Sequence, residues 1–205
     1  MKHQDLFVIY LHGFLSSPQS KKAQQTIHYC NETGLGDNLL VPELSGGPAE
    51  TLDEIQQCID SMEGKNIGLI GSSLGGYYAT CLAEANNLKA ALINPAVKPY
   101  LHWHEYIGEH DNYYSLKTHS VTKEHVRELQ RMDAEVLLYP QNYMLLVQTA
   151  DEVLDYRLAE TRYRAGTCII QEGGNHSFEN YAMFLPLIFD FLAVKIEDNP
   201  GSPLD

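Results

Sequence analysis

The stretch GSSLGG contains two adjacent serines, Ser72 and Ser73, whose setting suggests covalent chemistry. A nucleophile on a sharp turn from a strand into a helix has glycine two places before and two places after it, because larger side chains would crowd the strained backbone. Ser73 has Gly71 and Gly75 at those places, whereas Ser72 would have isoleucine and leucine there. G-x-S-x-G also occurs by chance in Gly/Ser-rich turns. The stronger argument for a nucleophile is that the motif lies between an apolar strand and a helical pattern. The sequence therefore predicts Ser73 as the nucleophile.

A serine nucleophile needs a base, and the base needs an acid that orients it. Where the serine lies on a turn from a strand into a helix, the order along the chain is serine, acid, histidine. Among the histidines that follow Ser73, only His176 lies in a glycine-rich turn just after a predicted strand, in QEGGNHSFENY. The alternative interpretation is a surface histidine beside a helix cap formed by Ser177. The matching order of elements favours His176 as the base.

The acid that orients this histidine is expected just after the preceding strand, in YMLLVQTADEVLDY. Asp151 follows the strand directly and is the first choice. Asp155, one helical turn later, is the second, and Asp133 and Glu135 are distant candidates. Acidic residues in this place could also simply stabilise the first turn of a helix.

When a serine attacks a carbonyl group, the carbonyl oxygen becomes an oxyanion, which two N–H groups usually stabilise. The backbone N–H of Leu74 stands at the start of the predicted helix, and the N–H of Phe14 is the expected second donor, from the loop YLHGFLSSPQS. His12 in this loop is expected to shape it rather than act as a base. Ser16 and Ser17 either line an acyl pocket or turn the chain.

The elements that must position these residues alternate between strand and helix. The pattern predicts an α/β fold: one domain over residues 1–205, with a mostly parallel sheet of about six strands and helices on both faces. Residues 98–140 interrupt the alternation and are interpreted as a small, partly helical lid at the active-site end of the sheet. Residues 177–197 read as a final helix that Pro186 could kink. Residues 198–205 are expected to be disordered.

Composition excludes several classes of protein. The chain has 205 residues and a formal net charge of −13, which argues against nucleic acid and anionic membrane surfaces as partners. No apolar run approaches a membrane span, and the run at residues 6–11 is too short for a signal peptide. The four cysteines form no C-x-x-C pair, so we expect reduced thiols and a cytoplasmic protein.

Five ordered motifs make the chain resemble an α/β-hydrolase, and more narrowly the small YqiA-like esterase family of bacterial proteins. They are YLHGFLSSPQSKK, GSSLGGYYA, INPAVKPY, QTADEVLDY and GGNHSFENY. The resemblance runs from about Phe7 to Leu192 and implies a cytoplasmic serine esterase acting on acyl esters, with acyl-CoA thioesters as a further candidate substrate. Ala150 stands where glycine would be expected before the acid.

The expected function is therefore hydrolysis of small-molecule carboxylic esters through an acyl-enzyme, without a metal or a cofactor. Trp103 and Tyr106 in the lid are candidate substrate contacts, together with Tyr100, Tyr113 and Tyr114. One alternative is a non-catalytic ligand-binding protein on the same fold. Another is a metallohydrolase built on His102, His104 and His110, whose spacing matches no established zinc motif closely. The oligomeric state is not predicted.

Overall fold

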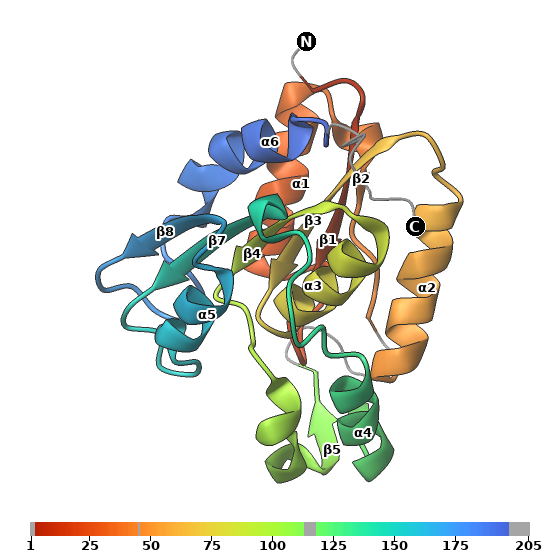
Figure 1. Ribbon diagram of the computed structural model, residues 1–205, viewed down its shortest axis with the longest axis vertical. Coiled ribbons are helices and arrows are strands. Elements are labelled where there is room, and N and C mark those ends of the chain that lie inside the picture. The colour runs from red at the N-terminus through yellow and green to blue at the C-terminus, as the bar shows by residue number, and fades with distance from the viewer. Residues whose placement is uncertain (1–2, 45, 113–117, 197–205) are drawn as a thin grey trace, which may run out of the picture.

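A computed structural model describes residues 3–44, 46–112 and 118–196, and a parallel sheet forms its centre (Figure 1). The sheet has six strands in the order β2-β1-β3-β4-β7-β8. The strands are β1 (Leu6–Leu11), β2 (Leu39–Leu40), β3 (Asn66–Ser72), β4 (Lys89–Ile93), β7 (Tyr143–Gln148) and β8 (Thr167–Gln171). Every neighbouring pair is parallel, which confirms the predicted sheet.

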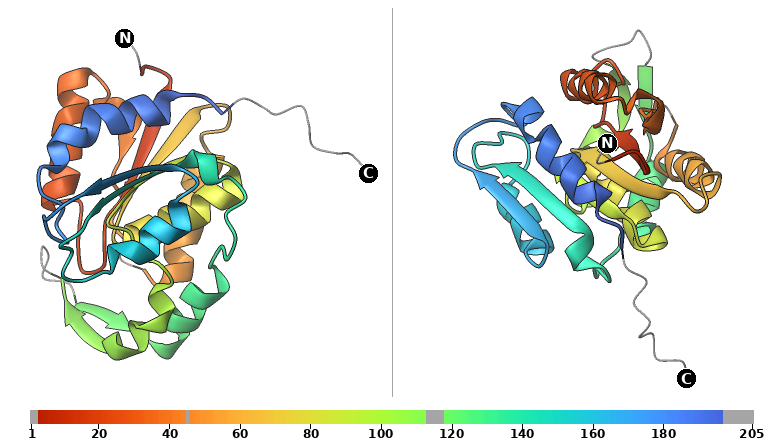
Figure 2. Two further views of the ribbon diagram at one scale, coloured as in Figure 1. Left: turned by 60° about the vertical axis from the view of Figure 1, so that its left-hand side comes forward. Right: turned by 90° about the horizontal axis from the view of Figure 1, so that it is seen from above.

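Helices cover both faces of this sheet (Figures 1 and 2). The main ones are α1 (Lys21–Thr33), α2 (Pro48–Asp60), α3 (Leu74–Asn86), α5 (Tyr156–Tyr163) and α6 (Leu185–Ala193). Buried residues of α2, α3 and α5 belong to one apolar cluster, and those of α1 and α6 belong to a second cluster on the opposite face. The result is a sheet sandwiched between two helical layers.

The nucleophile strand β3 shows why these strands read as continuous apolar runs. Its adjacent residues Leu69 and Ile70 are both fully buried, yet they pack in opposite clusters because side chains alternate between the faces of a strand. Gly68 lies under Leu192 of α6, and a Cβ at position 68 would stand 2.9 Å from the Leu192 Cβ. The glycine therefore allows α6 to pack closely against the centre of the sheet.

Residues 98–140, which we call the lid, follow β4. The described residues 99–112 and 118–131 lie beyond the ends of the strands, and residues 132–140 return along α3 to β7 (Figure 1). The lid contains two 3₁₀ turns (Pro99–Leu101 and Trp103–Tyr106), a hairpin of β5 (Gly108–Asp111) and β6 (Thr118–Val121), and helix α4 (Lys123–Arg131). The Tyr77 hydroxyl of α3 donates to the Leu129 carbonyl of α4 at 2.5 Å. The lid is thus tied to the helix that follows the elbow. Tyr113 and Tyr114 lie outside the described residues.

The end of the chain differs from the sequence prediction of one helix over residues 177–197. A 3₁₀ turn at Tyr181–Phe184 comes first, and α6 begins only at Leu185. Pro186 lies in the first turn of α6, where a missing N–H costs no helical hydrogen bond, so it starts the helix instead of kinking it. Ser177 accordingly does not cap α6. The tail at 198–205 lies outside the described residues. Among the helices that are described, none has the length and apolar character to cross a membrane.

Candidate active site

The turn from β3 into α3 has the strained geometry that a nucleophile elbow requires. Ser73 has φ 55° and ψ −122°, a conformation that non-glycine residues rarely adopt. A Cβ on Gly71 would collide with the carbonyl oxygen of Gly75, and a Cβ on Gly75 would collide with the carbonyl oxygen of Leu11. The two glycines that frame Ser73 are therefore required by packing. Ser72, in contrast, belongs to the strand and is 4% exposed.

The structure brings together the three side chains that the sequence singled out. His176 Nε2 lies 3.1 Å from Ser73 Oγ, and His176 Nδ1 lies 2.8 and 3.0 Å from the two carboxylate oxygens of Asp151. A carboxylate only accepts hydrogen bonds, so Nδ1 carries the proton and the neutral ring leaves Nε2 free to accept from the serine hydroxyl. This is the tautomer that a general base needs.

The Asp151 side chain is 2% exposed, and its surroundings keep it ionised. Burial raises the pKa of this carboxyl. Hydrogen bonds from the His176 ring and from the backbone N–H groups of Leu154 and Val153 outweigh that effect, so the net pKa lies below its usual value. A carboxylate held in this way stabilises an imidazolium ion on the neighbouring histidine.

The residue after the acid has a separate contact. The Glu152 carboxylate accepts a hydrogen bond from the His176 backbone N–H at 2.9 Å, and this bond lowers the pKa of Glu152. The hydrogen bond of Glu152 goes to the backbone that carries the imidazole and not to the ring itself. Nothing in the sequence distinguished this role from that of an ordinary acidic residue at a helix start.

Within the described part of the chain, no hydrogen bond engages the backbone N–H of Phe14 or that of Leu74, the residue after Ser73. The loop that carries Phe14 is pressed against the serine, because a Cβ on Gly13 would stand 3.6 Å from Ser73 Oγ. An unpaired N–H on the residue after Ser73 and another in the adjoining loop are the kind of donors that an oxyanion hole uses.

His12 fixes this loop. Its Nε2 accepts from the Leu44 N–H at 3.3 Å, so its Nδ1 carries the proton and donates to the Gly13 carbonyl at 3.0 Å. The Gly13 carbonyl and the Phe14 N–H belong to one planar peptide unit, so this bond also sets the direction of the Phe14 donor. Burial lowers the pKa of His12, against the opposing effects of the bond to Gly13 and of Glu43. Both ring nitrogens are occupied, which leaves His12 in the loop-shaping role that we expected.

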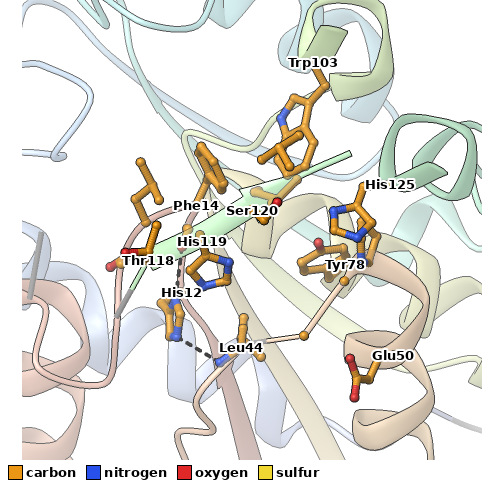
Figure 3. Close-up of a pocket in the computed structure, with 18 residues that line it drawn as sticks. His12, Phe14, Leu44, Glu50, Tyr78, Trp103, Thr118, His119, Ser120 and His125 are labelled. Carbon is orange, nitrogen blue, oxygen red and sulfur yellow. Dashed lines mark hydrogen bonds between the residues drawn. The ribbon is translucent and has the colours of Figure 1, made fainter. Parts of the chain in front are cut away.

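A pocket of about 250 Å³ adjoins these donors (Figure 3). Its walls come from the loop after β1, the segment before α2, the start of α3 and the lid. Phe14, Ser16, Leu74 and Trp103 are among the lining residues, whereas Tyr106 is not. Further lining residues are His12, Leu44, Glu50, Tyr78, Thr118, His119, Ser120, Val121 and His125. Ser17 is buried and accepts from the Gln19 N–H, so it turns the chain.

The remaining acidic candidates have other partners. Asp155 caps α5 by accepting from the Arg157 N–H at 3.0 Å. Asp133 accepts from Arg162 at 3.1 Å and from the Tyr100 hydroxyl at 2.8 Å. Glu135 is exposed in the lid.

The histidines that prompted the metal alternative do not form a site with other ligands. Within the described residues, no group of three or more His, Cys, Asp or Glu side chains could hold a metal ion. All four cysteines are free thiols.

Known proteins share both the fold and the sequence pattern. The "Putative hydrolase" of Agrobacterium vitis S4 has a TM-score of 0.75 at 18% identity, covering 93% of this chain and 90% of its own. Est1E from Butyrivibrio proteoclasticus with bound ferulic acid has a TM-score of 0.69 at 15% identity, covering 94% of this chain and 89% of its own. Together they establish the α/β-hydrolase fold.

The sequence comparisons identify the family. The UPF0227 protein YcfP of Salmonella paratyphi A (strain ATCC 9150 / SARB42) is 25% identical over 190 residues, which cover 90% of this chain and 97% of that protein. Residues 7–193 match the model of a family described as "Uncharacterised protein family (UPF0227)". The predicted resemblance is thus confirmed, and the chain belongs to the UPF0227 family.

Proposed function

We propose that the protein is a serine hydrolase that cleaves small carboxylic esters through an acyl-enzyme. The observation that carries this proposal is the unbroken chain of hydrogen bonds from Asp151 through His176 to Ser73, beside two unpaired backbone N–H groups. The similar structures are too distant in sequence to support more than the fold, so the proposal rests on this geometry.

The geometry supports the following reaction. His176 Nε2 takes the proton of Ser73 Oγ while Oγ attacks the ester carbonyl carbon, and the carbonyl oxygen becomes an oxyanion. The N–H groups of Phe14 and Leu74 donate to that oxyanion. The imidazolium gives its proton to the leaving alkoxide oxygen, and the carbon–oxygen bond breaks to leave the acyl group on Ser73. A water molecule, deprotonated by His176, then releases the acid and restores the serine.

We place the acyl group of the substrate in the pocket, which Phe14 and Leu74 line and which is not itself lined by Ser73 or His176. His176 must reach the leaving oxygen to protonate it, so the alcohol part of the substrate faces His176. The acyl group then extends the opposite way, past Phe14 and Leu74, into the pocket that these two residues line. Sites for drug-sized ligands are roughly 300–1,000 Å³, so a cavity of about 250 Å³ favours a short acyl group.

The lining of the pocket bears on the acyl group alone, because the alcohol or thiol part of the substrate faces His176. Oxygen esters and acyl-CoA thioesters therefore both enter the test. The four free thiols support the cytoplasmic setting that we propose for the reaction.

A fluorophosphonate and a panel of esters test this function. We expect the phosphonate to form one adduct, mapped by mass spectrometry to Ser73, and acetate to butyrate esters to turn over faster than octanoate esters. Acetyl-CoA in the same panel distinguishes oxygen esters from thioesters. Ser73→Ala serves as the control for both measurements. A folded protein that neither reacts with the phosphonate nor hydrolyses any ester would instead support the alternative of a non-catalytic binding protein.

A further inference from the structure

Asn94, directly after β4, lies where the three segments of the proposed active site meet. It is 2% exposed and has a φ of 40°, in the left-handed region. The chain around it pairs with the nucleophile: the Ser73 N–H donates to the Ile93 carbonyl at 3.1 Å, and the Ser73 carbonyl accepts from the Ala96 N–H at 3.0 Å. Asn94 is thus anchored to the backbone of Ser73.

Its side chain reaches the other two segments. Asn94 Nδ2 donates to the carbonyls of Asn175 and His176, at 3.0 and 3.2 Å, and Oδ1 accepts from the Gln148 N–H at 3.0 Å. Two carbonyls can only accept and an N–H can only donate, so these partners dictate the orientation of the amide. One side chain therefore connects the loop of the base to the end of β7, three residues before Asp151.

A second buried amide supports the same loop. Gln148 Oε1 accepts from the N–H groups of Asn175 and Glu179, at 3.1 and 2.8 Å. Gln148 packs so closely under Gly174 that a Cβ there would collide with Gln148 Oε1. These two buried amides hold the loop before His176 together with a backbone bond from the Ala150 N–H to the Gly173 carbonyl. Of the two amides, Asn94 is the one whose neighbours in the chain pair with Ser73.

We propose that Asn94 is a positioning residue: it sets the place of His176 relative to Ser73 and Asp151. This inference rests on the proposed function. The proposed role differs from a purely structural one because Asn94 donates a hydrogen bond to the backbone of His176 itself. Losing them frees the His176 carbonyl, and a displacement of about 1 Å in a catalytic group can cost about 100-fold in rate.

Asn94→Gly is the cleanest variant, because glycine adopts a φ of 40° without strain and only the side-chain bonds are lost. We expect kcat to fall about 100-fold with KM nearly unchanged, since the variant leaves the pocket and the N–H groups of Phe14 and Leu74 in place. Asn94→Asp keeps the size and the oxygen that accepts from Gln148, but it turns an oxygen toward two carbonyls. It should show the same loss of kcat, and it replaces the glycine variant if that variant does not fold.

Asn142→Ala is the matched control. Asn142 is also 2% exposed and donates to Asn87 Oδ1 at 2.9 Å, but it lies before β7, at the opposite end of that strand. Its loss should lower Tm as the Asn94 variants do and leave kcat unchanged. Equal kcat in Asn94→Gly and Asn142→Ala, both folded, would overturn the proposal.

A readout that does not need turnover separates this inference from the proposed function. The Nδ1–H of His176, bonded to Asp151, should give a low-field proton resonance in the wild-type protein. We expect that resonance to broaden or shift in Asn94→Gly and to persist in Asn142→Ala. A wild-type protein that is inert to the phosphonate would refute the esterase function while this spectrum still decides the role of Asn94. An unchanged resonance in Asn94→Gly would refute the role of Asn94 alone.

Discussion

The ring of Phe14 packs against the ring of Trp103, with centroids 4.9 Å apart and planes tilted by 55°. Three more lid rings surround Phe14 at centroid distances of 5.8 to 6.4 Å, those of Tyr106, His110 and His119. The residue whose N–H we assign to the oxyanion is therefore held by the lid. As a result, the lid is expected to influence the rate of reaction as well as the choice of substrate.

Trp103→Ala should change both properties. The indole lines the pocket, so its removal enlarges the acyl site, and it also removes the main contact of the Phe14 ring. We expect kcat/KM on acetate esters to fall while the preference moves toward longer chains. Each further buried methylene is worth about 0.8 kcal/mol, or about fourfold. The measurement is kcat/KM on a series from acetate to octanoate.

Tyr106→Ala provides the comparison within the lid. The rings of Tyr106 and Phe14 pack edge to face, with their centroids 5.9 Å apart, but Tyr106 does not line the pocket. Its removal should lower the rate slightly and equally at every chain length. A Trp103→Ala profile parallel to that of Tyr106→Ala would show that the indole only packs on the oxyanion loop and does not limit the acyl site.

Ser73→Ala should abolish hydrolysis and Ser72→Ala should retain most of it. Only Ser73 has the strained backbone and the bond to His176, while Ser72 is a buried strand residue. Loss of a triad serine costs about a million-fold in kcat in the subtilisin comparison. Turnover and phosphonate labelling of both variants check this, with circular dichroism to confirm folding. An adduct on Ser72 would contradict the assignment.

Asp151→Asn should keep the fold and lower turnover about 10,000-fold, the cost of the equivalent change in serine proteases. The amide cannot stabilise the imidazolium and favours the wrong tautomer of His176. Asp155→Asn should leave turnover nearly unchanged, because asparagine caps a helix about as well as aspartate does. Reversed effects of the two substitutions on kcat would mean that the acid is displaced by one helical turn.

The sequence predicted the proposed triad because each member follows the end of a parallel strand. Strand ends of this kind meet at one edge of a sheet, so Ser73, Asp151 and His176 could be brought together from the order of elements alone. The glycines at positions 71 and 75 could also be recognised in the sequence, because the crowded turn around Ser73 admits only glycine at those positions. The proposed role of Leu74 followed from its place directly after Ser73, and that of Phe14 from its place in the loop after the first strand.

Asn94 and the lid could not be predicted in this way. The partners of Asn94 are mainly backbone groups 54 to 82 residues away, and a backbone carbonyl has no signature in the sequence. The lid hairpin has polar strands, GEHD and THSV, without the alternation that marks a strand. Contacts with Phe14 organise it, and those contacts exist only after the sheet has formed.

Lys22 should give the protein an unusual dependence of stability on pH. Its ammonium donates to the Ser177 carbonyl at 2.9 Å, next to His176. Burial lowers the pKa of Lys22 to about 8, although the Asp151 carboxylate opposes that shift. In the unfolded chain the pKa of lysine is about 10.4, so between pH 8 and about 10.4 the unfolded state binds more protons than the folded state. The contribution of Lys22 to the free energy of unfolding therefore rises with pH across this window.

Lys22→Met should remove that rise, and Lys21→Met is the matched control because the neighbouring Lys21 is exposed. Urea unfolding at intervals from pH 7 to pH 10 gives the free energy of unfolding of the three proteins. Burial raises the pKa of Cys30 to about 12, and burial together with the Asp133 carboxylate raises that of Tyr100 to about 12. In the unfolded chain these groups titrate at about 8.5 and about 10, so they lower the free energy of unfolding as the pH rises through the window, equally in all three proteins. We expect the wild type and Lys21→Met to gain stability relative to Lys22→Met as the pH passes 8. Parallel curves for all three proteins would show that Lys22 keeps its proton in the folded state.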